Sequence, residues 1–535
     1  MIHNDSPRAV SRSALSFLSG TLLSRLSGLG RDMAMAVAFG SAPAIAAFMV
    51  AFRFANVIRR LFGEGNLPAG FIPHFEHIRA SSTEQGAQFF RDVLFSLAIF
   101  LTLLIGVADL GLLAVWKWGG LSSDSAQIIY LTVLMMPGIV FICLYGLSSA
   151  LLQCEKRFFL TGFAPVGFNC VWIVAAWWLK DKAPSDAVVY LSVAIVVAFL
   201  AQWLVIAPQT FGFLSRALSW KQSLRPRLFS PELKKMIAPF LLGAAGIGAV
   251  QINSALDALF ARFASLEGPA YLWYAIRIEQ LPLALFGIAL SSALLPSLAR
   301  ALKNEDYAQY LHLTRFALKR SFSLIFPCCA ALFVLGVAGI NLLYGRGGFS
   351  QQTTYHTVLC LWGYGLGLMP SVFVLFFASA FYAVKEYRIP TIGCILSVLL
   401  NVALNGWFVF GLHWGAFSIA LATSASAFFN FFYLAHHLKK RCAAPLFDSS
   451  VISSFLRVGC SAFAAAVIVL LVGHFLLDDP SLNLLFGEQY AIFARHFGDQ
   501  LLSFIALSGT FILIFLSYAW MLNAEDFLSF FKKRI

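Results

Sequence analysis

The sequence predicts an all-α polytopic membrane protein with about 14 transmembrane helices. Three observations support this prediction. Of the 535 residues, 60% are apolar and only 12% are charged, which leaves too little polar surface for a soluble chain. Long apolar segments recur along the chain, and basic residues are distributed unevenly among the loops between them. We expect two six-helix lobes followed by two extra C-terminal helices.

Twelve segments are long and apolar enough to cross a bilayer, which takes about 20 residues of helix. Two earlier segments, near 14–39 and 44–72, are apolar but contain arginines, and we count them as spans as well. The twelve lie near 93–116, 126–152, 158–179, 187–214, 236–264, 270–299, 317–344, 356–384, 389–411, 414–434, 451–478 and 500–522.

The loop charges orient these spans. With the N-terminus inside, 25 basic residues fall in cytoplasmic segments and 5 in outer loops. This asymmetry predicts that both termini lie in the cytoplasm. It also accounts for the net charge of +13, so we expect no nucleic-acid partner.

Two stretches of the chain read alike, which indicates an internal duplication. Ala51-Phe52-Arg53 precedes Leu61-Phe62-Gly63, and Ala275-Ile276-Arg277 precedes Leu285-Phe286-Gly287 with the same internal spacing. The shift covers an even number of spans, so the lobes would be related by a pseudo-two-fold axis along the membrane normal. The predicted boundaries are 1–213 for the first lobe, 214–235 for a cytoplasmic linker, 236–440 for the second lobe and 441–535 for the last two helices and the tail.

Apart from Lys319 and Arg320, which are counted with the adjoining cytoplasmic segment, the basic residues within the predicted spans are all arginines. An arginine at a helix centre costs about 2.5–3.5 kcal/mol on insertion scales, so such residues are expected to face a wet cavity. A guanidinium stays charged when desolvated and binds a phosphate through two parallel hydrogen bonds. The pattern therefore predicts a cationic cavity for an anionic substrate such as a diphosphate. The eight are Arg25, Arg31, Arg53, Arg59, Arg60, Arg262, Arg277 and Arg457.

The second span carries a polar stripe. Helical spacing places four of its residues on one face, and Gly63, Gly65 and Pro68 make a break in the helix probable on composition alone. The stripe residues are Arg53, Asn56, Arg60 and Glu64.

The first span has one candidate charge pair. Arg25 and Asp32 are seven residues apart and share a face, whereas Arg31 points elsewhere on an ideal helix. We expect the segment 27–30, with its two glycines, to bend and bring Arg31 inward. Asp32 and Glu64 are the acids that would pair with arginines or gate the cavity.

These motifs resemble the lipid II flippases of the MurJ/MviN family, in the multidrug/oligosaccharidyl-lipid/polysaccharide exporter superfamily. The resemblance covers about residues 14–440 and is most specific at Asn56–Gly65 with Phe71-Ile72-Pro73. Other matching segments are Ser24–Asp32, Lys156-Arg157-Phe158 with Ala164-Pro165 and Asn169, Tyr274-Ala275 with Arg277, Leu294–Leu298, and Phe381-Tyr382-Ala383 with Pro390.

The resemblance implies a function and a site. The substrate would be lipid II, the undecaprenyl-diphosphate-linked disaccharide peptide, moved to the outer leaflet by a chain that we expect to be monomeric and surrounded by membrane lipids. In the family, a groove formed by the last two helices takes the lipid tail. The phosphate-binding role falls on Arg25, Arg31, Arg59, Arg60 and Arg277, with Arg53 and Asn56 beside them.

The chain departs from the family pattern in two places. Ala46 and Ile276 stand where many members carry an acid, which leaves this cavity more positive. Some members also bind sodium in the second lobe, and the matching residues are Asp257, Asn401, Asn405 and Thr423. Sodium or a proton would then be the coupling cation, and no other cofactor is expected. Hydrogen bonding between helices is the alternative role for the two asparagines.

Three other functions were weighed. A flippase for another lipid-linked saccharide would use the same arginines. An exporter of organic cations or drugs would line its cavity with acids instead. An intramembrane enzyme is disfavoured because the sequence contains no HExxH or GxSxG motif and no cluster of carboxylates with a histidine. We therefore predict a transporter and not an enzyme.

Overall fold

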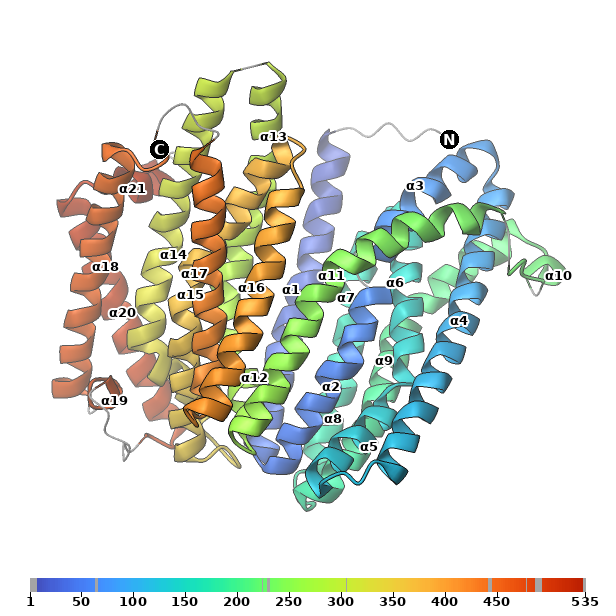
Figure 1. Cartoon of the computed structure of the whole chain (residues 1–535), viewed down its shortest axis with the longest axis horizontal. Coiled ribbons are helices and arrows are strands. Elements are labelled where there is room, and N and C mark those ends of the chain that lie inside the picture. The colour runs from blue at the N-terminus through green and yellow to red at the C-terminus, as the bar shows by residue number, and fades with distance from the viewer. Residues whose placement is uncertain are drawn as a thin grey trace. The chain divides into compact units, whose positions relative to one another are not determined.

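The fold was analysed in a computed structural model of the chain. The structure describes residues 7–62, 66–223, 225–228, 231–304, 306–440, 445–477, 479–485 and 493–532. Within these residues every regular element is a helix, which confirms the predicted all-α class (Figure 1). The chain divides into two compact units, Met1–Ala255 and Leu256–Ile535. The boundaries predicted at 213, 235 and 440 stay predictions.

The first unit is a bundle of helices that pack pairwise. α1 contacts α7 and α8, while α9 contacts α5, α6 and α8. Its helices are α1 (Pro7–Phe39), α2 (Pro43–Phe62), α3 (Asn66–Ser81), α4 (Thr83–Trp118), α5 (Ser123–Met135), α6 (Gly138–Cys154), α7 (Phe158–Phe163), α8 (Pro165–Leu179), α9 (Pro184–Ala217), α10 (Trp220–Ser223) and most of α11 (Pro231–Ala264).

The second unit contains two short π-helices among its α-helices. α15 packs against α12, α14 and α17, and α18 packs against α14 and α20. Its elements are the end of α11, α12 (Gly268–Pro282), η1 (Leu283–Ile288), α13 (Ala289–Lys303), α14 (Tyr307–Tyr344), α15 (Gln351–Ala383), α16 (Arg388–Gly406), η2 (Trp407–Gly411), α17 (Phe417–Lys439), α18 (Ser449–Leu476), α19 (Ser481–Leu485), α20 (Phe497–Met521) and α21 (Glu525–Lys532).

Much of the predicted set of spans is present. Among the described residues, nine helices are long and apolar enough to cross a membrane. A tenth span results if α5 and α6, which meet at 45°, are one bent span. The count of 14 also needs α1, α2, α11 and the α12–η1–α13 segment, so it stays a prediction.

Two expectations concern the shape of the first two predicted spans. In the span near 44–72, α2 ends at Phe62 and α3 begins at Asn66. Gly63, Glu64 and Gly65 lie outside the described residues, so the expected break there stays a prediction. The segment 27–30 belongs to α1, which runs from Pro7 to Phe39, and the expected bend stays a prediction. Close backbone contact fixes α1 against α7: a Cβ on Gly20 would lie 2.6 Å from the carbonyl oxygen of Phe159.

Candidate functional site

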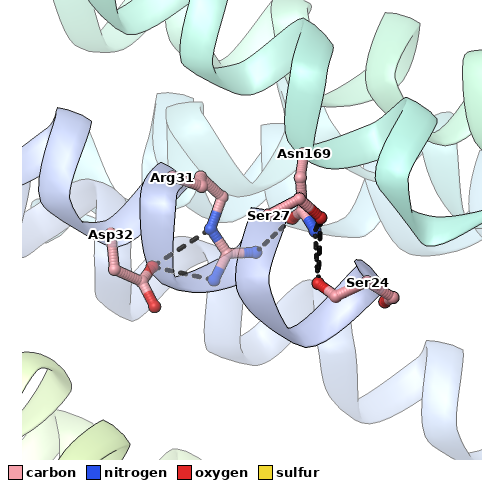
Figure 2. A network of polar contacts seen from close by, with 5 residues as sticks. All are labelled: Ser24, Ser27, Arg31, Asp32 and Asn169. Carbon is pink, nitrogen blue, oxygen red and sulfur yellow. Dashed lines mark hydrogen bonds and ion pairs between the residues drawn. The ribbon is translucent and has the colours of Figure 1, made fainter. Parts of the chain in front are cut away.

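Arg31 lies in the interior of the first unit and is paired with its neighbour in the sequence. Its Nε and Nη2 donate to Oδ1 of Asp32 at 3.0 and 2.8 Å (Figure 2). Both residues are buried in α1. Arg31 thus lies inside the unit, as expected, and it pairs with Asp32 although the two positions point in different directions on an ideal helix. An arginine side chain is long enough to fold back onto the adjacent residue, so positions on an ideal helical wheel do not decide its partner.

Asn169 of α8 completes this arrangement. Its Oδ1 accepts a hydrogen bond from Nη1 of Arg31 at 3.2 Å, and its Nδ2 donates to Oγ of Ser27 at 2.9 Å and to the carbonyl oxygen of Ser24 (Figure 2). The Arg31 guanidinium also lies over the ring of Trp172, 4.7 Å from its centroid. We call Arg31, Asp32, Asn169 and Trp172 the α1–α8 cluster. It ties the two helices together with a charge that is neutralised locally.

The other arginines of the predicted spans in the first unit are more accessible. Arg25 is exposed on α1, Arg60 is exposed near the end of α2, and Arg59 is half-buried beside it. Arg53 donates from Nη1 to the carbonyl oxygen and to Oγ of Ser254 on α11, both at 3.2 Å. Glu64 lies outside the described residues, so its pairing stays a prediction.

Asn56, a polar residue of the α2 stripe, has a side chain whose hydrogen bonding is incomplete among the described residues. It is half-buried, and its Oδ1 is buried without a hydrogen-bond partner among the described residues. A buried acceptor of this kind is costly unless water or a ligand reaches it. The position suits a residue that lines a wet cavity.

Arg277 lies on α12 of the second unit and is half-buried. Its guanidinium is 4.5 Å from the centroid of the Trp273 ring, one turn earlier on the same helix. Stacking of this kind orients the planar guanidinium and leaves its edge available for hydrogen bonds. A shared cluster of Arg277 with the arginines of the first unit stays a prediction.

Two further arginines have structural positions. Arg262 is buried and donates from Nη1 to the carbonyl oxygen of Leu266, near the end of α11. Arg457 is exposed on α18 and donates to the carbonyl oxygen of Asn523 at 3.0 Å. Hydrogen bonds to carbonyl groups at helix ends suit structural roles for both.

The four residues that the resemblance suggested for sodium do come together in the second unit. Nδ2 of Asn405 donates to Oδ1 of Asp257 at 2.8 Å and to Oδ1 of Asn401 at 2.9 Å. Nδ2 of Asn401 donates to Oγ1 of Thr423 at 3.3 Å. The network joins α11, α16 and α17, and both asparagines are fully buried.

The donor set of this network fits a monovalent cation. Carboxylate, amide and hydroxyl oxygens are the hard ligands that such ions take, and Asp257 supplies one negative charge. In the arrangement described, however, the amide group of Asn405 faces Asp257 and Asn401 as a hydrogen-bond donor. The same contacts also provide hydrogen bonding between helices, which is the alternative role for the two asparagines.

Sequence reasoning missed several residues of the site. Trp172 and Trp273 were not singled out, although each is stacked by a site arginine. An aromatic residue one turn before Arg277 is a signal that helical spacing offers. Arg91 was one of the 25 basic residues assigned to cytoplasmic segments, yet it lies buried in α4 against Asp92. The Arg-Asp dipeptide, which occurs at 31–32 and at 91–92, was the signal that could have indicated this buried pair.

Comparison with known proteins places the chain in a family. A family model described as "Lipid II flippase MurJ" matches residues 35–482. The chain belongs to the MurJ lipid II flippase family. This match to the MurJ family includes α2, Arg277 and the Asp257 network, whereas Arg25, Arg31 and Asp32 lie just before its first residue.

Relatives in this family match nearly the whole chain. A "Probable lipid II flippase MurJ" of Chlamydia pneumoniae is 31% identical and covers 99% of this chain and 95% of its own. A "Lipid II flippase MurJ" of Burkholderia cenocepacia is 30% identical, covering 80% and 84%. The family assignment confirms the resemblance seen in the motifs.

Solved structures agree on the fold. A "Lipid II flippase MurJ, inward closed conformation" has a TM-score of 0.74 at 21% identity and covers 95% of this chain and 99% of its own. An inward-facing multidrug resistance MATE family transporter of the MOP superfamily has a TM-score of 0.61 at 17% identity, covering 81% and 100%. The helical architecture is thus that of MurJ and MATE transporters.

Proposed function

We propose that this chain flips lipid II from the inner to the outer leaflet of the cytoplasmic membrane by alternating access, and that it acts as a monomer. The observation that supports the proposal is the set of arginines on α2, an otherwise apolar helix whose residues 45–52 are buried. Arginines at such a position suit an anionic substrate. Membership of the MurJ family supplies the substrate.

The arginines divide into two roles under this proposal. Arg25, Arg59, Arg60 and Arg277 bind the diphosphate, with Arg53 and Asn56 beside them. Arg31 positions α1 against α8, because Asp32, Asn169 and Trp172 engage its guanidinium on three sides. Bidentate hydrogen bonds to phosphate oxygens need guanidinium groups, so lysine is a poor substitute at the binding positions.

Complementation of a flippase-depleted bacterium tests the proposal, with lipid II in the outer leaflet as the readout. Arg59→Lys should impair transport and Arg59→Ala should abolish it, while both proteins accumulate normally. Arg457→Ala is the matched control, since Arg457 is also an arginine of a predicted span but is exposed and bound to a backbone carbonyl. Normal growth with an Arg59→Ala, Arg277→Ala double variant contradicts the proposal.

A flippase for a different lipid-linked saccharide is the second candidate, because any diphosphate suits the arginines. Supplying reconstituted protein with lipid II and with a lipid-linked saccharide that lacks the peptide distinguishes the two. Lipid II should be moved faster. Equal rates would mean that the diphosphate and lipid alone are recognised.

The proposed direction of transport requires both termini in the cytoplasm. In a cysteine-free background, a cysteine at 225 should not be labelled in intact cells, and one at 495 should be. Both native side chains, Arg225 and Arg495, are exposed, so burial within the protein does not confound the result. The reverse labelling pattern would overturn the 14-span topology.

Sodium is proposed as one coupling cation, bound by Asp257, Asn401, Asn405 and Thr423. Asn405→Asp adds a second carboxylate to the network and should raise the affinity for sodium, whereas Asp257→Asn should remove binding. The readout is the thermal unfolding midpoint in sodium relative to potassium, because a ligand that binds only the folded state stabilises it. Equal midpoints for the unmodified protein in both salts would show that the network serves only to join helices.

A further inference from the structure

Glu279 is a buried carboxyl group that the proposed mechanism does not use. It lies on α12, only 8% exposed, two residues after Arg277. Successive helical positions are 100° apart, so a residue two positions on lies nearly on the opposite side of the helix. Arg277 is half-buried on one side and Glu279 is enclosed on the other. The two are therefore not a neutralised pair like Arg31 and Asp32.

The surroundings of Glu279 offer no counter-charge. Among the residues that the structure describes, Glu279 takes part in no ion pair and no hydrogen bond. α12 packs against α14, α15 and η1. A titratable group near Glu279 is the thiol of Cys329 on α14, which is itself buried and close enough to interact electrostatically with the carboxyl group.

The arginines and the lysine of α14 contact other groups and not Glu279. Arg315 pairs with Asp448 at 2.9 Å, and Lys319 and Arg320 both contact Asp526. These residues lie nine or more positions before Cys329 on the helix, which is about 13 Å or more along its axis. None of them supplies the charge that an ionised Glu279 would need.

The other titratable groups facing α12 are neutral or distant. The sequence of η1, Leu-Ala-Leu-Phe-Gly-Ile, contains no titratable residue. His356 of α15 stacks on Tyr271, two turns before Glu279, with ring centroids 5.0 Å apart. The remaining groups on the adjoining stretches of α14 and α15 are Cys328, Cys360 and Tyr364.

Burial without a counter-charge favours the neutral form of a carboxyl group. Transfer of an ionised carboxylate into an apolar interior is so costly that the group takes up a proton instead. Ionisable residues within membrane spans commonly mark ion or proton pathways. Glu279 thus has the character of a proton-binding group.

The segment that follows Glu279 is suited to rearrangement. Pro282 lacks a backbone N–H, and the π-helix η1 begins at the next residue. π-helical turns are rare and occur frequently at functional sites. A shift in this segment would alter the exposure of a carboxyl group one turn away.

We propose that Glu279 is a proton-coupling site: its carboxyl group is protonated in the conformation described, and it releases the proton to water when α12 and η1 rearrange. The carboxylate binds one proton again as the segment closes, so one proton is taken up and released in each cycle. Only the coupling of this proton to a transport cycle rests on the proposed function; the protonation of Glu279 does not. The protonation state of Glu279 follows from its burial and from the absence of a counter-charge among the described residues.

Infrared difference spectroscopy tests the protonation state directly. At neutral pH the unmodified protein should show the carbonyl stretch of a protonated carboxylic acid, and Glu279→Gln should remove that contribution. Glutamine has the same shape as the protonated acid, so the variant should fold and accumulate normally. The matched control is Glu267→Gln at the start of the same helix, where the side chain is only partly buried; it should leave the band unchanged.

Transport tests the coupling. In proteoliposomes, lipid II movement by the unmodified protein should respond to an imposed pH gradient, and Glu279→Gln should lose that response while Glu267→Gln keeps it. An infrared band unchanged by Glu279→Gln, or an unchanged response to the gradient, overturns the proposal. If the unmodified protein moves no lipid II but the infrared band is lost in Glu279→Gln, the transport function fails and the assignment of a protonated Glu279 stands.

Discussion

Two Arg-Asp dipeptides in the first unit adopt the same local geometry in different places. In α1, Arg31 donates from Nε to Oδ1 of Asp32 at 3.0 Å, and in α4 Arg91 donates from Nε to Oδ1 of Asp92 at 2.9 Å. All four side chains are buried. In each case Nη2 of the arginine binds the same Oδ1 atom, so the charge is neutralised between neighbours.

The difference lies in what each pair does with its remaining hydrogen-bonding groups. In α1, Nη1 of Arg31 reaches Asn169 on another helix. In α4, Nη1 of Arg91 reaches the carbonyl oxygen of Gln222, and Asp92 also accepts from the backbone N–H of Arg227 at 2.9 Å. The first pair therefore joins two helices, and the second holds the predicted linker, residues 214–235, against α4. The same Arg-Asp dipeptide therefore forms the same ion pair in both helices but makes different tertiary contacts.

The largest effect is expected on removing the acid from the α1 pair. Asp32→Ala leaves Arg31 buried and uncompensated, and breaking a buried ion pair in this way costs about 3–5 kcal/mol. Thermal or denaturant unfolding in detergent measures the loss. An Arg31→Met, Asp32→Ala double variant should recover most of it, because no charge then remains. A loss below about 1 kcal/mol for Asp32→Ala would mean that water reaches Arg31.

Removing the acid from the α4 pair should act on the linker. Asp92→Ala leaves Arg91 without its acid, as Asp32→Ala does for Arg31, and it also takes away the acceptor of the Arg227 N–H. For the linker, the loss of that hydrogen bond costs about 1–3 kcal/mol. Because 1.4 kcal/mol corresponds to a factor of ten in an equilibrium, trypsin should cut after Arg227 about tenfold faster.

The control for this experiment is Glu84→Ala. Glu84 also contacts the linker, accepting from Nε2 of Gln222 at 2.8 Å, but both side chains are at the surface. Exposed contacts contribute little, so cleavage should change less than twofold. If both variants are cut at the same rate as the unmodified protein, the Arg91–Asp92 pair does not hold the linker.

The comparison also shows how far the sequence alone reaches. The apolar segments predicted the helical class, because their length and composition can be seen directly in the sequence. The motif match predicted which four residues meet at Asp257, because their positions along the chain match those of the family. The partner of Arg31 was not predictable from spacing, since neighbouring positions point 100° apart on a helix and only the reach of the side chain joins them. Glu279 was not singled out from the sequence, because its burial is visible only in the structure.

A smaller effect is expected at Asn169, the partner that distinguishes the α1 pair. Asn169→Ala removes one acceptor of Arg31 and two donors to α1, which should cost about 1–3 kcal/mol of unfolding free energy. Asn56→Ala is the matched control, because the Asn56 amide oxygen is buried without a hydrogen-bond partner among the described residues. It should be near neutral or stabilising. Equal losses for the two asparagines would mean that Asn169 does not fasten α1 to α8.

The smallest effects are expected for two serines, one beside each pair. Oγ of Ser27 accepts from Asn169 at 2.9 Å, and Oγ of Ser96 donates to the carbonyl oxygen of Leu228 in the linker at 3.2 Å. Replacing either by alanine should cost about 1 kcal/mol, the usual net contribution of one hydrogen bond. The two readouts should respond differently, because the Ser27 hydrogen bond joins α1 to α8 and the Ser96 hydrogen bond holds the linker against α4. Ser96→Ala should speed tryptic cleavage of the linker about fivefold and leave global unfolding nearly unchanged, whereas Ser27→Ala should lower the unfolding free energy and leave cleavage unchanged. If both serines affect both readouts alike, the two Arg-Asp regions unfold as one unit and the division of tasks between them is lost.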